Sequence, residues 1–145
     1  MMPQKKLLIL SFFTILCIAI LHISALRLHW YFTHRWIDIV IHILGGFWVA
    51  LTAMWLAIRL KHIEAFPHYR KNAFIIVLFA VALVGIAWEL FELLSGNTFL
   101  HTSNFWTDSV SDMINNFLGG AIAYLCLMNI RKQGNIFNTN NNLIS

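Results

Sequence analysis

Two segments of the chain carry the same polar pattern at the same spacing, with residue types that could bind a cation or move a proton. The pattern is D-x3-H-x-L-G-G over residues 38–46 and D-x3-N-x-L-G-G over residues 112–120. In each copy a His or Asn follows the acid by one helical turn, and a glycine pair follows after another turn. At about 100° per residue these positions share one face of a helix. The repeat predicts two related helices with their polar ends together.

Three further carboxylates extend this polar group, and one of them is hard to explain structurally. Glu89 and Glu92 lie near the C-terminal end of an apolar run, where the helix dipole disfavours negative charge. A carboxylate in apolar surroundings is costly unless it is protonated or paired. We therefore expect Glu89 to be functional and to pair with His42 or with a bound metal. The third carboxylate is Asp108.

Three kinds of chemistry are open to these residues. A divalent metal could bind Asp38, His42 and Glu89, because oxygen ligands suit Mg, Ca or Mn and imidazole favours Zn. Metal-activated water could then hydrolyse a lipid-linked or cell-envelope substrate. A metal-free acid–base site is the second alternative, and a pocket for a cation or cationic headgroup is the third. The expected catalytic residues are Glu89, His42 and Asp112, and the expected binding residues are Asp38, Glu92, Asp108 and Asn116.

A purely structural role is also open for each residue. Asp112 follows Ser109 by three positions, as in a helix capping box, and Asp38 stands near the start of its run. Asn116 could join two helices by hydrogen bonds. The sequence has no HExxH, Walker loop, GxGxxG or nucleophile elbow. It therefore does not decide between an enzyme and a non-enzymatic binding or structural protein.

The composition indicates that a bilayer surrounds these residues. Of the 145 residues, 59% are hydrophobic and 11% are charged, and the mean hydropathy is +0.71. A soluble domain usually has about 25% charged residues. Four apolar runs are long enough to cross the hydrocarbon core, which takes about 20 helical residues: 7–26, 36–60, 73–94 and 110–130. We expect an all-α integral membrane bundle of four transmembrane helices, formed by two parallel helical hairpins.

The ends of the chain need separate interpretations. The first run begins after basic residues, as a signal peptide does, but it is long and no A-x-A site follows, so we interpret it as a retained span. The transmembrane domain is expected to cover residues 1–132. The Asn-rich segment 133–145 has too little apolar content to pack and is predicted to be a disordered cytoplasmic tail.

The positive charges predict the orientation. With the N-terminus inside, eight of the ten Lys and Arg residues are cytoplasmic, which places both termini in the cytoplasm of a cell inner-membrane protein. The net charge of +4 then reflects topology and not a nucleic-acid partner. Membrane lipid is the expected partner, and a homodimer or a partner membrane protein stays open. The external positive charges are Arg27 and Arg35, beside an aromatic belt that includes Trp30 and Tyr31.

Four of the seven glycines belong to the repeat. Small residues at helical spacing let membrane helices approach closely. Helix contacts are therefore expected at Gly45, Gly46, Gly119 and Gly120.

At these residues the chain resembles the VanZ-like superfamily. The resemblance rests on Asp38-x3-His42, on Trp88-Glu89, and on Asp108/Asp112 with Asn116-x-x-Gly119-Gly120. It covers roughly residues 36–123 and looks closest to the YjdF-like group of uncharacterised small bacterial membrane proteins. VanZ-like proteins usually have Gln where this chain has Glu92, and an Arg in the following loop, which here has none. The resemblance implies a multi-span bundle with a polar site on the envelope side and no particular reaction.

Overall fold

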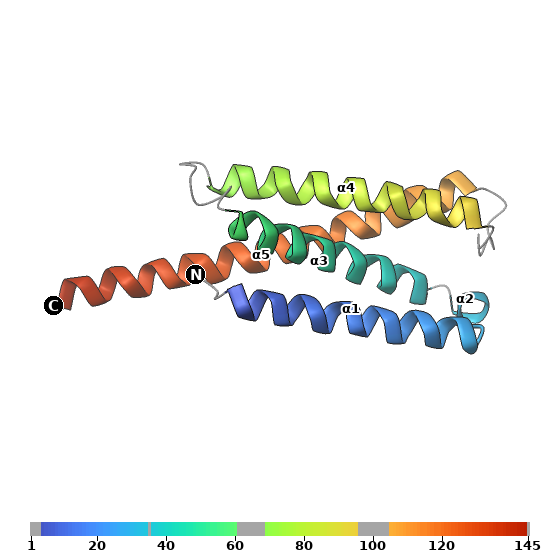
Figure 1. Ribbon diagram of the computed structural model, residues 1–145, viewed down its shortest axis with the longest axis horizontal. Coiled ribbons are helices and arrows are strands. Elements are labelled where there is room, and N and C mark those ends of the chain that lie inside the picture. The colour runs from blue at the N-terminus through green and yellow to red at the C-terminus, as the bar shows by residue number, and fades with distance from the viewer. Residues whose placement is uncertain (1–3, 35, 61–68, 96–104, 145) are drawn as a thin grey trace.

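The computed structural model describes residues 4–34, 36–60, 69–95 and 105–144, and every regular element in these ranges is an α-helix. Four long helices lie side by side, and a short one, α2 (Trp30–Thr33), lies at one end of the bundle (Figure 1). We call this the α2 end. The long helices are α1 (Gln4–Arg27), α3 (Trp36–Arg59), α4 (Tyr69–Ser95) and α5 (Phe105–Ile144).

Four segments of these helices are long and apolar enough to cross a membrane. Helices suit this setting because each satisfies its own backbone hydrogen bonds where no water is present. Large apolar side chains cover the outside of the bundle, as lipid contact requires; Phe79 is 70% exposed and Phe12 is 61% exposed. The predicted all-α membrane bundle is confirmed. The spanning segments are Lys5–Arg27, Trp36–Arg59, Arg70–Leu94 and Trp106–Asn129.

The central helix of the bundle is α3, which packs against α1, α4 and α5. Within the described ranges the backbone of α4 lies close to both α3 and α5, whereas the backbone of α1 lies close to α3 and the short α2. An added Cβ on Gly120 would come within 2.9 Å of Cγ2 of Val81, so α4 and α5 are also in close contact. The larger apolar core cluster lies in the half away from α2 and includes Ala50, Leu51, Met54, Val77 and Ala123. A smaller cluster at the α2 end is formed by Ala25, Tyr31, Ile37 and Ile41.

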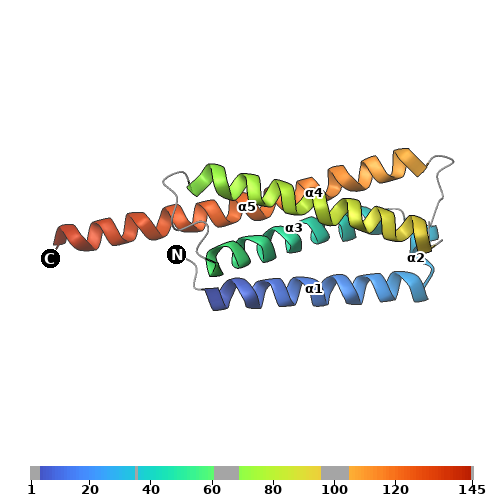
Figure 2. The same cartoon turned by 45° about the horizontal axis from the view of Figure 1, so that its top comes forward.

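The two helices that carry the sequence repeat run in the same direction, and α1 and α4 run in the opposite direction (Figure 2). Equivalent residues of the repeat meet across the α3–α5 interface, because Nδ1 of His42 lies 3.4 Å from Nδ2 of Asn116. The repeat therefore describes the pairing of α3 with α5. The flanking helices break the symmetry, since α4 touches both repeat helices and α1 touches one.

The α3–α5 interface depends on two glycines. A Cβ on Gly46 would overlap the backbone carbonyl of Asn116, and one on Gly119 would overlap the carbonyl of Ile43. The two backbones are in direct contact at these points, which no larger residue permits. Gly45 differs, because its added Cβ would meet only Oδ1 of Asn116 at 3.5 Å, an ordinary contact.

Helix α5 continues to Ile144 and projects beyond the other helices (Figure 1). This differs from the disordered tail predicted for residues 133–145. The physical reason is that extending an existing helix avoids the unfavourable nucleation step, so residues with modest helix propensity can follow the apolar span.

The glycine contacts lead to a paired prediction. Gly46→Ala should lower the free energy of unfolding by about 1–3 kcal/mol, because neither backbone can move aside. Gly45→Ala, one residue away, should be neutral or stabilise the helix by about 0.5–1 kcal/mol. Thermal unfolding of both variants in detergent measures the difference. Equal stability of the two variants would contradict the proposed backbone contact.

Candidate functional site

Helices α3 and α5 bring together three side chains that can hold a metal ion: Asp38, His42 and Asp112. One ligand atom from each residue lies within 4.8 Å of the other two. Nε2 of His42 is 3.6 Å from Oδ1 of Asp38 and 3.6 Å from Oδ2 of Asp112. His42 and Asp112 are buried, whereas the Asp38 side chain is 35% exposed. We call these three residues the Asp–His–Asp group.

The spacing within the Asp–His–Asp group fits a bound cation better than direct hydrogen bonds. An N–H···O hydrogen bond spans about 2.7–3.2 Å between the heavy atoms, and both separations here are 3.6 Å. Ligands about 2.0–2.2 Å from a tetrahedral metal lie about 3.3–3.6 Å from one another. The imidazole therefore stands from each carboxylate at the distance expected between two ligands of one ion.

Local helix geometry positions the three residues. Asp38 and His42 are one turn apart on α3, so their side chains lie on the same face. Asp38 is in the first turn of α3, where negative charge suits the helix dipole. Helix α5 begins at Phe105, more than one turn before Asp112. The capping-box interpretation of Ser109 and Asp112 is therefore wrong, because neither residue is at the helix start.

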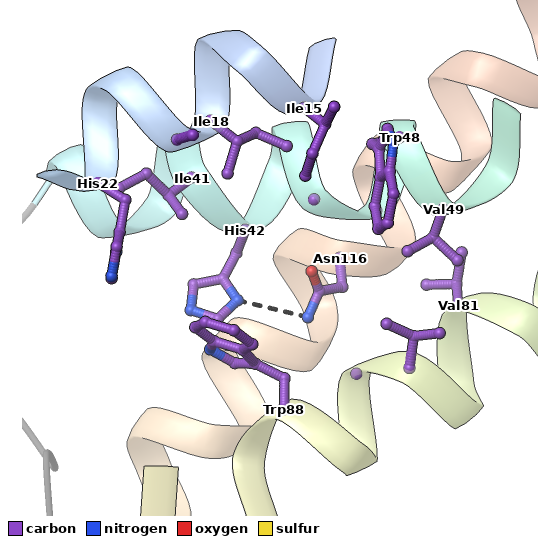
Figure 3. Close-up of a pocket in the computed structure, with 15 residues that line it drawn as sticks. Ile15, Ile18, His22, Ile41, His42, Trp48, Val49, Val81, Trp88 and Asn116 are labelled. Atoms are coloured by element: carbon purple, nitrogen blue, oxygen red, sulfur yellow. Dashed lines mark hydrogen bonds between the residues drawn. The ribbon is translucent and has the colours of Figure 1, made fainter. Parts of the chain in front are cut away.

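Asn116 contacts the other nitrogen of the His42 ring, as the dashed line in Figure 3 shows. In this arrangement the amide donates to Nδ1, and Nε2 carries the ring proton toward the two carboxylates. With the amide turned over, its oxygen would accept from Nδ1–H and leave the Nε2 lone pair for a metal. The side chain of Asn116 can thus support either form of the imidazole.

The other predicted acids lie near the Asp–His–Asp group but outside it. Among the described residues, the carboxylates within 4.0 Å of His42 belong to Asp38 and Asp112, so the predicted direct pair of His42 with Glu89 is not formed. Oε1 of Glu89 is buried without a hydrogen-bond partner among the described residues. Asp112 takes the ligand position that the sequence assigned to Glu89. The remaining acids of this end, Glu92 and Asp108, are half-buried.

A cavity of about 270 Å³ adjoins the group between α1, α3 and α4. His42 and Asn116 form its polar wall, and isoleucine, valine and tryptophan side chains form the rest (Figure 3). These apolar residues come from the middle of the membrane-spanning segments. The cavity therefore connects apolar space inside the bundle with the Asp–His–Asp group. The apolar residues include Ile15, Ile18, Trp48, Val49, Val81 and Trp88.

His22 lines the cavity toward the α2 end and forms a hydrogen bond with Tyr31. The Tyr31 hydroxyl lies 2.6 Å from Nδ1 of His22, and the His22 ring meets the edge of the Trp88 ring at a centroid distance of 6.3 Å. This contact links α1 to α4. Burial, together with the nearby charges of Asp38 and Glu92, raises the pKa of Tyr31. The hydroxyl thus keeps its proton and can donate it in the hydrogen bond to His22.

Sequence reasoning assigned Tyr31 only to an interfacial belt and missed this role. His22 lies on α1 and Tyr31 on α2, and between them His29 adopts a left-handed conformation with φ of 56°. A turn of this kind interrupts helical periodicity, so no spacing rule connects the two residues. A local signal for their contact is therefore lacking in the sequence.

The comparison with known families agrees with the membrane architecture. A family model described as "Predicted membrane protein (DUF2238)" matches residues 3–133, which include all four spanning segments. No curated protein and no solved structure matches the chain. The match and the four apolar helices together make this a multi-pass membrane protein.

The hydrogen bond between Tyr31 and His22 can be tested by removing the Tyr31 hydroxyl. Tyr31→Phe should lower the free energy of unfolding by about 0.5–1.5 kcal/mol, the usual net value of a buried hydrogen bond. The matched control is Tyr124→Phe, which removes an exposed hydrogen bond to the Arg70 carbonyl and should change stability little. Thermal unfolding in detergent gives both values. A Tyr31→Phe variant no less stable than Tyr124→Phe would show that the contact does not hold α2 in place.

Proposed function

The chain belongs to the DUF2238 family of predicted membrane proteins, and we propose that it binds a divalent cation at Asp38, His42 and Asp112 to hydrolyse a lipid-linked substrate. One observation carries this proposal: an imidazole and two carboxylates from repeat-related helices stand at the spacing of metal ligands inside a membrane bundle. Ionisable residues in such surroundings are costly and usually functional.

The ligand set suggests which cation binds and what it does. One nitrogen and two oxygen ligands suit Zn²⁺ or Mn²⁺ better than Ca²⁺. Three protein ligands leave coordination positions free for water and for substrate, and a bound cation turns water into a nucleophile. Glu89 is the residue best placed to take the proton from that water, because one of its oxygens is buried and has no hydrogen-bond partner.

The proposed orientation puts this chemistry on the envelope side of the membrane. The α2 end would face outward and both termini would be cytoplasmic, as the distribution of Lys and Arg favours. Arg35 and Lys61, which contribute to that distribution, lie outside the described residues. The resemblance to VanZ-like proteins supports the same placement. A substrate linked to lipid at the outer leaflet would then reach the site.

A second candidate function needs no metal, and the Asn116 contact favours it. With the amide donating to Nδ1, the His42 Nε2–H points toward the two carboxylates and the group is satisfied internally. The cluster would then hold α3 to α5 or bind a cationic headgroup, without turnover. The two functions predict opposite responses to metal ions.

The cation proposal predicts metal-dependent stability. Zn²⁺ or Mn²⁺ at about 100 times its Kd should raise the free energy of unfolding of the chelator-treated protein by about 2.7 kcal/mol. His42→Gln should abolish this response. His34→Gln should keep it, because His34 is exposed and its ring forms a hydrogen bond with the neighbouring Thr33, outside the Asp–His–Asp group. Thermal unfolding of all three proteins with and without metal, and calorimetric titration, measure the response.

If the cluster works without a metal, the same measurements should give different results. Metal ions would leave unfolding unchanged, and Glu89→Gln would be tolerated or stabilising, because it removes a carboxylate from an apolar environment. That combination would refute the cation proposal. Stabilisation by metal that survives in His34→Gln and is lost in His42→Gln would refute the metal-free function.

The orientation has its own test. A reporter that works only in the cytoplasm should be active when fused after Ser145 and inactive when inserted at Gly96, because the positive-inside rule puts these positions on opposite sides. Reporter activity at Gly96 together with inactivity at Ser145 would reverse the proposed orientation.

A further inference from the structure

We infer that the cavity between α1, α3 and α4 holds one hydrocarbon chain of the lipid-linked substrate, which enters sideways from the bilayer between α1 and α4. The inference rests on the proposed function only for the identity of the headgroup at the Asp–His–Asp group. The entry of the chain itself follows from the shape and polarity of the cavity.

The cavity has the polarity gradient of a lipid. Its α1 and α4 walls are apolar, with Ile15 and Ile18 facing Val81 and Val84. Its polar atoms come from His42 and Asn116, together with His22 toward the α2 end. A molecule that fills the space is therefore apolar along most of its length and polar near the Asp–His–Asp group. A hydrocarbon chain attached to a headgroup has this distribution, and a free polar metabolite does not.

The mouth of the cavity opens toward lipid. One of its lining residues on α4, Val84, is 43% exposed on the surface that the membrane covers. The backbones of α1 and α4 do not come close to each other within the described ranges, so backbone contact does not seal the gap. Toward the α2 end, by contrast, the His22–Tyr31 hydrogen bond and the His22–Trp88 contact close it.

The broken symmetry of the bundle explains why the cavity exists on this side. Helix α4 covers both repeat helices, whereas α1 covers only α3, so one side of α3 is incompletely packed. Lipid tails are as apolar as the cavity walls, so entry depends on packing contacts and not on the hydrophobic effect. The surrounding bilayer supplies hydrocarbon chains at very high local concentration. Occupancy by a chain therefore does not require a bound metal.

Photocrosslinking in a bilayer tests this inference directly. The full chain is reconstituted in phosphatidylcholine vesicles that contain a phospholipid with a diazirine at the end of one acyl chain, and adducts are mapped by mass spectrometry after irradiation. We expect adducts on Ile41 and Val49, which line the cavity but are each only 8% exposed. Annular lipid should label exposed residues such as Phe79 in any case.

A matched pair of variants separates the cavity from the annulus. Val84→Trp should block the mouth and reduce labelling of Ile41 and Val49 by about tenfold, equivalent to about 1.4 kcal/mol of binding free energy. Ile86→Trp places the same side chain on a lipid-exposed position that does not line the cavity and should leave that labelling unchanged. Labelling of Phe79 serves as the internal reference in both variants.

Three results would overturn the inference. Adducts confined to exposed positions would show that the chain stays outside, and unchanged labelling in Val84→Trp would show another route. A photoreactive residue placed at Val49 that crosslinks to a second copy of the protein and not to lipid would show that a second chain fills the cavity. The outcome is independent of the cation proposal, because chelator treatment of the wild-type protein should remove metal-dependent stabilisation and leave lipid labelling of Val49 unchanged.

Discussion

The backbone contact between α3 and α5 is the constraint on which the rest of the structure depends. Gly46 lies against the carbonyl of Asn116, and Gly119 lies against the carbonyl of Ile43. Because both contacts occur within one turn of the polar residues, they fix how close His42 comes to α5. Larger residues at these two positions would separate the helices and move Asp112 away from the imidazole. The close packing thus forms the interface and sets the ligand spacing.

This arrangement places polar and ionisable side chains, which are costly in hydrocarbon, between helices that the bilayer surrounds. His42, Asp112 and Asn116 are buried between two spanning helices, and lipid offers no hydrogen bonds to compensate. The repeat provides compensation within the protein, since α3 supplies Asp38 beside the imidazole and α5 supplies Asp112 and Asn116. Such a cluster limits the possible sequences at the interface, because loss of one member leaves the others unpaired in a medium of low dielectric constant.

The flanking helices α1 and α4 do not follow the symmetry of the repeat, and this is as important as the symmetric pairing of α3 with α5. The repeat pairs α3 with α5, but α4 contacts both helices whereas α1 contacts one. The resulting cavity shares His42 and Asn116 with the polar cluster. The cavity gives this site one apolar wall, and the Asp38 side chain is partly exposed. An apolar chain and water could therefore reach the Asp–His–Asp group from different directions. This is the geometry expected of a site for amphipathic molecules.

The sequence by itself determined which segments form helices and at which level along these helices the polar residues lie. Long apolar runs specify membrane helices because the backbone must be satisfied internally, and the D-x3-[H/N]-x-L-G-G repeat placed Asp38, His42 and Asp112 on facing helices. It could not rank the acids around His42. Burial cost singled out Glu89, but the register of α3 against α5 put Asp112 beside the imidazole, and register arises from contacts between distant segments.

Only the tertiary structure decided the remaining features. The start of α5 at Phe105 removed the capping role of Asp112, because helix ends depend on packing as well as on local residues. The contact of Tyr31 with His22 crosses a left-handed turn that no periodicity spans. The cavity depends on the position of α1, which packs against α3 and, within the described ranges, not against α5. The sequence specified each helix and its polar face, and the packing of four helices determined which of those faces meet.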